Sequence, residues 1–266
     1  MRLAMLGTGG ALVTNCYNTC FALTENGEAF LTDCGGGNGI LRQLERASID
    51  VRSVRQVFIT HRHLDHFTGA LWLMRMIAYL MRHGRYEGDA FFYGHDEVIE
   101  LLRSISMSLI DAKESRFIGE RIHLVPLADG EEFVVLGHRA VCFDIHSTKA
   151  RQSGYSLFYA DGKKLTCLGD EPYRECERKY AEGSEWLLHE AFCLWEDRER
   201  FRPYEKHHST ARDAAEAAER LGVKNLVLYH TEDDDLPHRK ERYTKEGLKY
   251  FSGSLFVPDD LESFEL

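Results

Sequence analysis

The chain is organised around Thr60-His61-Arg62-His63-Leu64-Asp65-His66, in which three histidines and one aspartate occupy six positions. The β-branched and aromatic run Val57-Phe58-Ile59 comes directly before it and predicts a buried strand. Gly69 and the apolar stretch 70–80 predict a helix directly after it. The cluster is therefore expected on a loop at the carboxyl end of a strand, where α/β sheets commonly place ligands.

Imidazole nitrogens and a carboxylate form a ligand set that suits zinc, manganese or iron. In an extended segment His61 and His63 point the same way, because side chains alternate with period two. Once the chain turns, Asp65 and His66 can face a second point nearby. One short segment can thus begin two adjacent metal sites. A polar loop with incidental histidines is the alternative, and the chain's 13 histidines make such a dense cluster improbable by chance.

Composition indicates a globular protein that works without a membrane. Hydrophobic residues are 44% and charged residues 29% of 266, enough to build a large core. We expect one domain over residues 1–266, since no linker, repeat or composition break interrupts the chain. A net charge of -10 argues against tracking a long polyanion. The chain has no long apolar run and no secretion-type N-terminus, so we expect a cytoplasmic protein. Its seven cysteines form no C-x-x-C pair, so we expect reduced thiols.

Three later strands are each expected to end in a candidate metal ligand. These are His146, Asp170 and His230, after apolar runs at 140–145, 164–168 and 223–229. The carboxylate of Asp170 can bridge two cations, or it can cap a helix that begins near Pro172. Asp33, after a strand at 29–32, either supports a ligand histidine by a hydrogen bond or caps the next helix.

The seven candidate ligands divide into two sets. The first ion would take His61, His63, His146 and Asp170, and the second would take Asp65, His66, His230 and Asp170. Two cations about 3.5–4 Å apart lower the pKa of a bridging water toward neutrality and absorb developing negative charge. The sequence therefore predicts a hydrolase with two divalent metal ions, zinc first, with manganese or iron as alternatives.

The spacing His-x-His-x-Asp-His resembles the signature of the metallo-β-lactamase superfamily. The chain is most similar to its ribonuclease Z branch, the tRNA 3′-end endonucleases. The motifs that carry this similarity lie at 6–10, 31–35, 59–66, 169–170, 189–191 and 208–210. The resemblance implies an α/β fold, an αββα sandwich of two mixed β-sheets packed face to face with helices outside. It also implies phosphodiesterase or endonuclease activity on RNA, and pairing into homodimers.

In that branch a histidine of a His-Ser-Thr triplet donates a proton to the leaving group, and a glutamate orients it. Carried over to this chain, these residues are His208 and Glu190, and we count them with Asp65 as catalytic. A cap of the following helix is the alternative role for His208.

One departure from the branch changes the expected substrate. Many bacterial tRNA-processing members carry a flexible arm, and here the matching interval, 147–169, reads as a plain hairpin. We therefore expect a small phosphodiester or RNA substrate and no extended docking of tRNA. The alternative enzyme hydrolyses carboxylic esters, lactones, thioesters or amides at the same site, and it would not need His208 and Glu190. A binding protein without turnover and an oxygen-reducing di-iron protein fit the residues less well.

Overall fold

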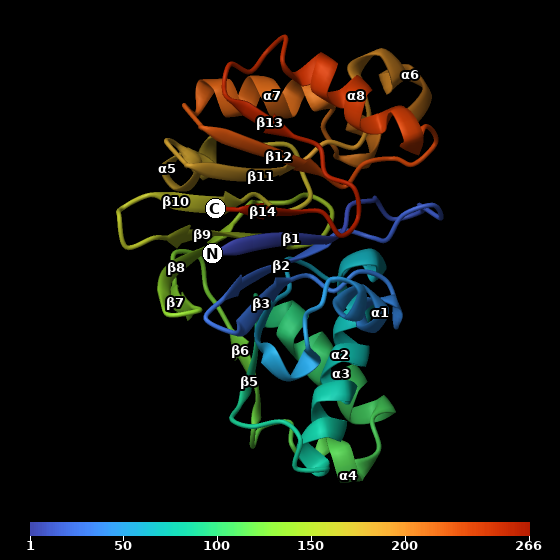
Figure 1. Cartoon of the computed structure of the whole chain (residues 1–266), viewed down its shortest axis with the longest axis vertical. Coiled ribbons are helices and arrows are strands. Elements are labelled where there is room, and N and C mark those ends of the chain that lie inside the picture. Colours follow the sequence, from blue (N-terminus) through green and yellow to red (C-terminus); the bar gives the residue numbers. More distant parts are fainter. The chain divides into compact units, whose positions relative to one another are not determined.

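The structure is a computed structural model that describes residues 1–266. The chain divides into two compact units, each built on one seven-stranded mixed sheet (Figure 1). Unit 1 contains Met1–Gly7, Tyr17–Ala128 and Asp260–Leu266, and unit 2 contains Thr8–Cys16 and Asp129–Asp259. The expectation of a single domain stays a prediction. None of the helices combines the length and apolarity needed to cross a membrane.

The sheet of unit 1 has the strand order β14-β1-β2-β3-β4-β5-β6. Its strands are β1 (Arg2–Gly7), β2 (Cys20–Glu25), β3 (Glu28–Thr32), β4 (Val54–Phe58), β5 (Ala90–Gly94), β6 (Ile122–Pro126) and β14 (Ser263–Glu265). Strands β14 to β3 pair antiparallel, whereas β3 to β6 run parallel. The predicted metal loop follows β4, so it lies at the carboxyl edge of the parallel part of this sheet.

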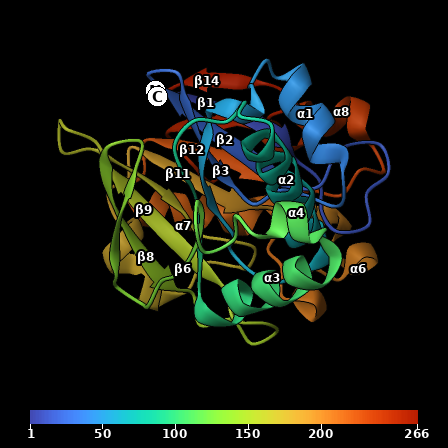
Figure 2. The same ribbon diagram turned by 90° about the horizontal axis from the view of Figure 1, so that it is seen from below.

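Helices cover the sheet of unit 1, and the longest of them carries part of the metal loop (Figure 2). They are α1 (Gly39–Arg46), α2 (Leu64–Arg82), α3 (Asp96–Leu109), α4 (Ala112–Ser115) and the 3₁₀ turn η1 (Val51–Ser53). Apolar residues of α2 such as Leu73 and Ile77 belong to one buried cluster with Leu31, Val57 and Phe92 of the strands. Burial of this face fixes the start of α2, where the candidate ligands lie.

The sheet of unit 2 has the order β13-β12-β11-β10-β9-β8-β7. Its strands are β7 (Glu132–Val135), β8 (His138–Asp144), β9 (Ser153–Phe158), β10 (Lys164–Cys167), β11 (Trp186–Glu190), β12 (Asn225–Tyr229) and β13 (Ser254–Phe256). Strands β10 to β13 run parallel, so the residues after β10, β11 and β12 meet at one edge of the sheet.

Figure 1 shows α7 and α8 beside the parallel strands of unit 2. The helices of this unit are α5 (Arg178–Ala181), α6 (Arg198–Phe201), α7 (Ala211–Arg220) and α8 (Leu236–Gly247), with 3₁₀ turns η2 (Glu175–Glu177), η3 (Trp195–Asp197) and η4 (Tyr204–Lys206). The alanine face of α7 packs closely in one core cluster with Leu187, Leu226 and Leu228. Small side chains let this helix approach the strands and hold the loop that precedes it.

The expected α/β fold with two mixed sheets is confirmed. One helix begins earlier than its charge pattern predicts: the Lys, Arg and Glu-rich pattern predicts a helix from Arg239, and α8 begins at Leu236 because Pro237 favours the first turn. The segment 111–119 reads as a polar connection, yet it contains α4, whose single turn is capped by Asp111.

Candidate metal centre

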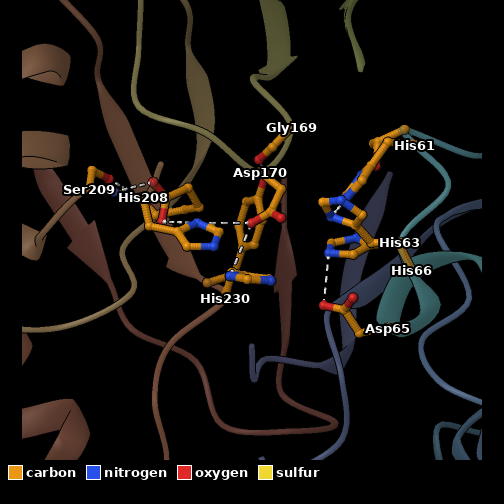
Figure 3. Close-up of polar contacts among 12 residues, drawn as sticks. His61, His63, Asp65, His66, Gly169, Asp170, His208, Ser209 and His230 are labelled. Atoms are coloured by element: carbon orange, nitrogen blue, oxygen red, sulfur yellow. Dashed lines mark hydrogen bonds and ion pairs between the residues drawn. The ribbon is translucent and has the colours of Figure 1, made fainter. Parts of the chain in front are cut away.

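Unit 1 brings together the four polar residues of the organising stretch (Figure 3). Asp65 and His66 lie in the first turn of α2, and His63 is its N-cap residue. The Nε2 of His61 lies 2.8 Å from the Nδ1 of His63, and the Nε2 of His66 lies 3.2 Å from an oxygen of Asp65. His61, Asp65 and His66 are buried. The loop thus brings imidazole and carboxylate donors together within unit 1, and their role as metal ligands stays a prediction.

Asp33 orients His66 and the loop before it. Its Oδ2 lies 2.8 Å from the Nδ1 of His66 and also accepts from the hydroxyl of Thr60, while its Oδ1 accepts from the Thr60 amide. A proton on Nδ1 leaves the Nε2 of His66 available as a ligand atom. Burial lowers the pKa of His66, but Asp65 and Asp33 outweigh it and hold that pKa well above its usual value.

The two alternatives for Asp33 are thereby resolved in favour of the supporting role. Helix α1 begins after Asn38, which makes no side-chain cap, so Asp33 does not cap it. Asp33 also adopts a φ of 56°, which is uncommon for a residue other than glycine. Such strain at a strand end is typical of functional sites, where surrounding contacts keep it in place.

Close backbone packing fixes the first turn of α2. The amide of Cys34 donates to the carbonyl of His66, and the amide of Gly69 donates to the carbonyl of Gly35. A Cβ added at Gly69 would lie 1.9 Å from the carbonyl oxygen of Cys34, so only glycine allows this approach. The hydroxyl of Tyr17 donates to the same carbonyl of Cys34 at 3.0 Å. The ligand-bearing turn is thus held by backbone contacts on one side.

Unit 2 holds a second, fully buried donor set. Asp170, Glu190, His208 and His230 each place one ligand atom within 4.8 Å of the others. Figure 3 shows both imidazole rings turned toward Asp170. The Nδ1 of His230 lies 3.0 Å, and the Nδ1 of His208 3.5 Å, from the Oδ1 of Asp170. Three of these residues follow or end neighbouring parallel strands, so the sheet edge itself assembles the set.

Glu190 is the last residue of β11, and its carboxylate lies on the Nδ1 side of the His208 ring. One of its oxygens accepts from the amide of Ser209, and the other lies 3.7 Å from the Nδ1 of His208. Burial raises the pKa of Glu190 above its usual value, although His189 and His230 oppose this effect. Glu190 therefore lies beside His208, and the catalytic roles of the two residues stay a prediction.

Two alternative roles as helix caps are wrong. Thr210, and not His208, caps α7, through a capping box with Asp213. No helix begins directly after Asp170, whose amide instead donates to the side-chain oxygen of Gln152 at 3.2 Å. Both residues therefore keep their side chains for the donor set.

His230 depends on partners that the sequence did not reveal. It adopts a φ of 58° immediately after β12. The next residue, Thr231, and Thr8 both accept hydrogen bonds at 3.0 Å from the buried guanidinium of Arg239 in α8. The amide of Gly10 also donates to the carbonyl of Thr231. The contacts of Thr8 with Arg239 and of Gly10 with Thr231 link residues more than 200 positions apart, and no local pattern signals them.

His146 occupies a different environment from the other predicted ligands. It is exposed and has a φ of 56°, beyond the end of β8. Its amide donates to the side chain of Asp144, and its carbonyl accepts from Arg174. Its side chain is not among the converging donors of unit 2. Its role as a ligand stays a prediction.

Both donor sets fit a divalent metal. Each unit offers imidazole nitrogens and carboxylate oxygens on buried side chains, the combination that zinc, manganese and iron accept. The thiols are not part of either set, although five of the seven free cysteines are buried. The donor chemistry therefore favours an oxygen and nitrogen site over a structural zinc–cysteine site.

Known proteins resemble this chain over nearly its whole length. A family model described as anti-Pycsar protein Apyc1 matches residues 1–249. Ribonuclease Z of Methanothermobacter thermautotrophicus is 29% identical over 307 aligned positions, covering 100% of this chain and 97% of that protein.

Two solved structures share the fold. The metallo-β-lactamase fold protein YhfI from Bacillus subtilis gives a TM-score of 0.78 at 16% identity, with 99% of each chain covered. The short form of human tRNase Z gives a TM-score of 0.75 at 21% identity, covering 100% of this chain and 99% of that one. The expectation of a metallo-β-lactamase fold is confirmed.

Proposed function

The chain belongs to the anti-Pycsar protein Apyc1 family, and from this membership and its buried donor sets we propose that it is a metal-dependent hydrolase of small phosphodiesters. The observation that carries the proposal is the placement of His208 between Glu190 and Asp170. An alkoxide leaving phosphorus needs a proton, and an imidazole oriented by a carboxylate can supply it. Ribonuclease Z, to which the chain is 29% identical, is a relative whose name denotes cleavage of RNA.

We assign the metal ligands as the sequence predicts. His61, His63, His146 and Asp170 would hold one ion, and Asp65, His66, His230 and Asp170 the other. Zinc is the first choice, because histidine-rich sets with one or two carboxylates suit it well. When bound, such ions polarise a phosphoryl oxygen and activate water.

Residues of the chain that are not metal ligands position His66 and supply the proton for the leaving group. Asp33 fixes the tautomer of His66 through the 2.8 Å contact at Nδ1. Glu190 and Asp170 lie on the Nδ1 side of His208, so its Nε2 is turned away from both carboxylates. That nitrogen is the one we assign to protonate the leaving oxygen.

The substrate is proposed to be a small phosphodiester or RNA, and extended docking of tRNA is disfavoured. Residues 147–169 contain only β9, β10 and their connections, with no arm. The alignment with ribonuclease Z spans 307 positions against 266 residues here, so that relative contains segments that this chain lacks. A net charge of -10 also disfavours a long polyanion.

We further propose that the protein pairs with a second copy and works in the cytoplasm. Trp72 and Tyr79 on α2 are each 41% exposed, and they line a shallow apolar pocket with Leu41 and Met76. A second copy of this face would cover them. Trp72→Glu should then convert a dimer to a monomer in light scattering.

The proposed cytoplasmic location is supported by the seven free thiols, which suit a reducing compartment.

Hydrolysis of bis(p-nitrophenyl) phosphate tests the proposed activity, because this diester is small and needs no docking arm. The metal-loaded protein should release p-nitrophenolate, and His61→Ala should abolish the release. p-Nitrophenyl acetate tests the competing esterase activity. Turnover of the acetate, with none of the diester in zinc, manganese or iron, would replace the phosphodiesterase proposal by the esterase.

A further inference from the structure

A single lysine lies beside the outward nitrogen of His208. The Nζ of Lys149 is 3.4 Å from the Nε2 of His208. Lys149 is half-buried, and its ammonium makes no ion pair with a carboxylate of the chain. The ammonium therefore lies next to the nitrogen assigned to the leaving group, and its remaining N–H donors face no carboxylate of the chain.

The backbone that carries Lys149 is anchored to a buried carboxylate. The hydroxyl of Ser147 accepts from the amides of Lys149 and Ala150, at 3.2 and 3.3 Å, and donates to Glu171. Glu171 is 2% exposed, and its other oxygen accepts from Arg174 at 2.8 Å. These hydrogen bonds fix the backbone of the turn at 147–150, so the Cα of Lys149 has a defined position.

The surroundings of His208 add an aromatic wall and a second cation. The ring of Phe192 stacks on His208 with centroids 5.1 Å apart. The ammonium of Lys206 lies 4.8 Å from the centroid of Phe192, and it too makes no ion pair. Thr148 contacts His207 at 2.8 Å and so joins the lysine turn to the segment before His208. The printed contacts of the His208 ring therefore place the Lys149 ammonium at Nε2 and the Phe192 ring against one face.

We propose that Lys149 binds a non-bridging oxygen of the substrate phosphate, and that it thereby selects phosphodiesters over neutral esters. This assignment rests on the proposed function, because it places the phosphate next to His208. A charged hydrogen bond from an ammonium to a phosphate oxygen is about twice as strong as a neutral one. A carboxylic ester carries no such charge, so the same contact contributes little to its binding. The lysine accordingly distinguishes the two substrate classes that share this fold.

Binding of inorganic phosphate and turnover of the diester together test the assignment. Lys149→Met removes the charge and keeps most of the stem, whereas Lys149→Arg restores the charge. Lys163→Met is the matched control, because Lys163 is exposed and pairs with Asp161 and Glu185 on a distant turn. Calorimetry with inorganic phosphate and kinetics with bis(p-nitrophenyl) phosphate are run on the metal-loaded proteins.

Lys149→Met should weaken phosphate binding about tenfold and raise KM for the diester more than it lowers kcat. Lys149→Arg should recover most of the affinity, and Lys163→Met should match the wild type. Unchanged phosphate affinity in Lys149→Met, or no phosphate binding by the wild type, overturns the assignment. A fall in kcat alone would show that Lys149 acts only through His208, which also overturns it. If phosphate binding depends on Lys149 but no diester is cleaved, the proposed function fails and the binding site stands.

Discussion

The Nδ1 of His66 lies 2.8 Å from the Oδ2 of Asp33, a carboxylate 33 positions earlier in the chain. The same carboxylate accepts two hydrogen bonds from Thr60, so it joins the end of the strand region to the first turn of α2. This arrangement keeps a proton of His66 on Nδ1, so Nε2 is the nitrogen that a metal ion would bind. Asp33 therefore supports the proposed metal site by positioning His66, although Asp33 is not itself a metal ligand.

Asp33→Asn should lower metal affinity by roughly 10–100-fold, because an amide holds the ring of His66 less firmly and no longer increases its basicity. Competition with a chromogenic chelator measures the change. Asp50→Asn is the matched control, since Asp50 is exposed and bonds only to its own turn. Equal metal affinities for the wild type and Asp33→Asn would show that Asp33 does not support metal binding.

His208→Ala should slow cleavage of diesters with poor leaving groups by about 10²–10⁴-fold. The loss should be much smaller with p-nitrophenolate, which leaves without a proton. Rates for p-nitrophenyl and alkyl diesters, compared in the same variant, measure this difference. His207→Ala, the adjacent histidine, should not reproduce the pattern. Equal slowing for both leaving groups would exclude a proton donor.

The candidate donors could be predicted because each lies next to a strong local signal. His61, Asp170 and His230 follow runs of apolar and β-branched residues, which predict strands that end there. The parallel order of the strands then brings the later two together, as expected. His146 follows a comparable run, yet it adopts a left-handed backbone conformation and its side chain is exposed.

The supporting residues could not be predicted, because their roles arise from long-range contacts. Arg239 reads as one more charge in a basic helix, but it is buried and bonds to Thr8. Lys149 sits in an unremarkable polar segment, and only the fold brings it to His208. Short helices such as α4 contain too few residues to display a periodicity.

Glu177→Gln should stabilise the protein increasingly as the pH rises. Burial raises the pKa of Glu177 from 4.5 to about 9. The folded state therefore favours the protonated carboxyl, and the stability it contributes is complete below about pH 4.5 and is lost as the pH rises toward 9. Glutamine stays neutral and avoids this loss.

Thermal unfolding at pH 5 and pH 8 measures the effect. Tm of Glu177→Gln should exceed that of the wild type by on the order of 5 °C at pH 8, with a much smaller difference at pH 5. Glu199→Gln, at an exposed position, is the control and should show no such trend. A gain that is independent of pH would contradict the buried, protonated state of Glu177.

Precursor tRNA should be a poor substrate relative to small diesters, because residues 147–169 form only strands and connections. Parallel assays with a 3′-extended tRNA and bis(p-nitrophenyl) phosphate, with a ribonuclease Z as positive control, compare the two. Efficient and accurate 3′ trimming by this chain would show that the missing arm is not needed.

Elemental analysis of the purified protein and its ligand variants tests the central claim most directly. The account predicts two divalent ions per chain in the wild type. His61→Ala and His230→Ala should each lose one ion, and Asp170→Ala should weaken both. Circular dichroism confirms that each variant is folded. A wild type that binds no ion after saturation with zinc, manganese or iron, or variants that retain two, would contradict the claim that these side chains hold a pair of metals.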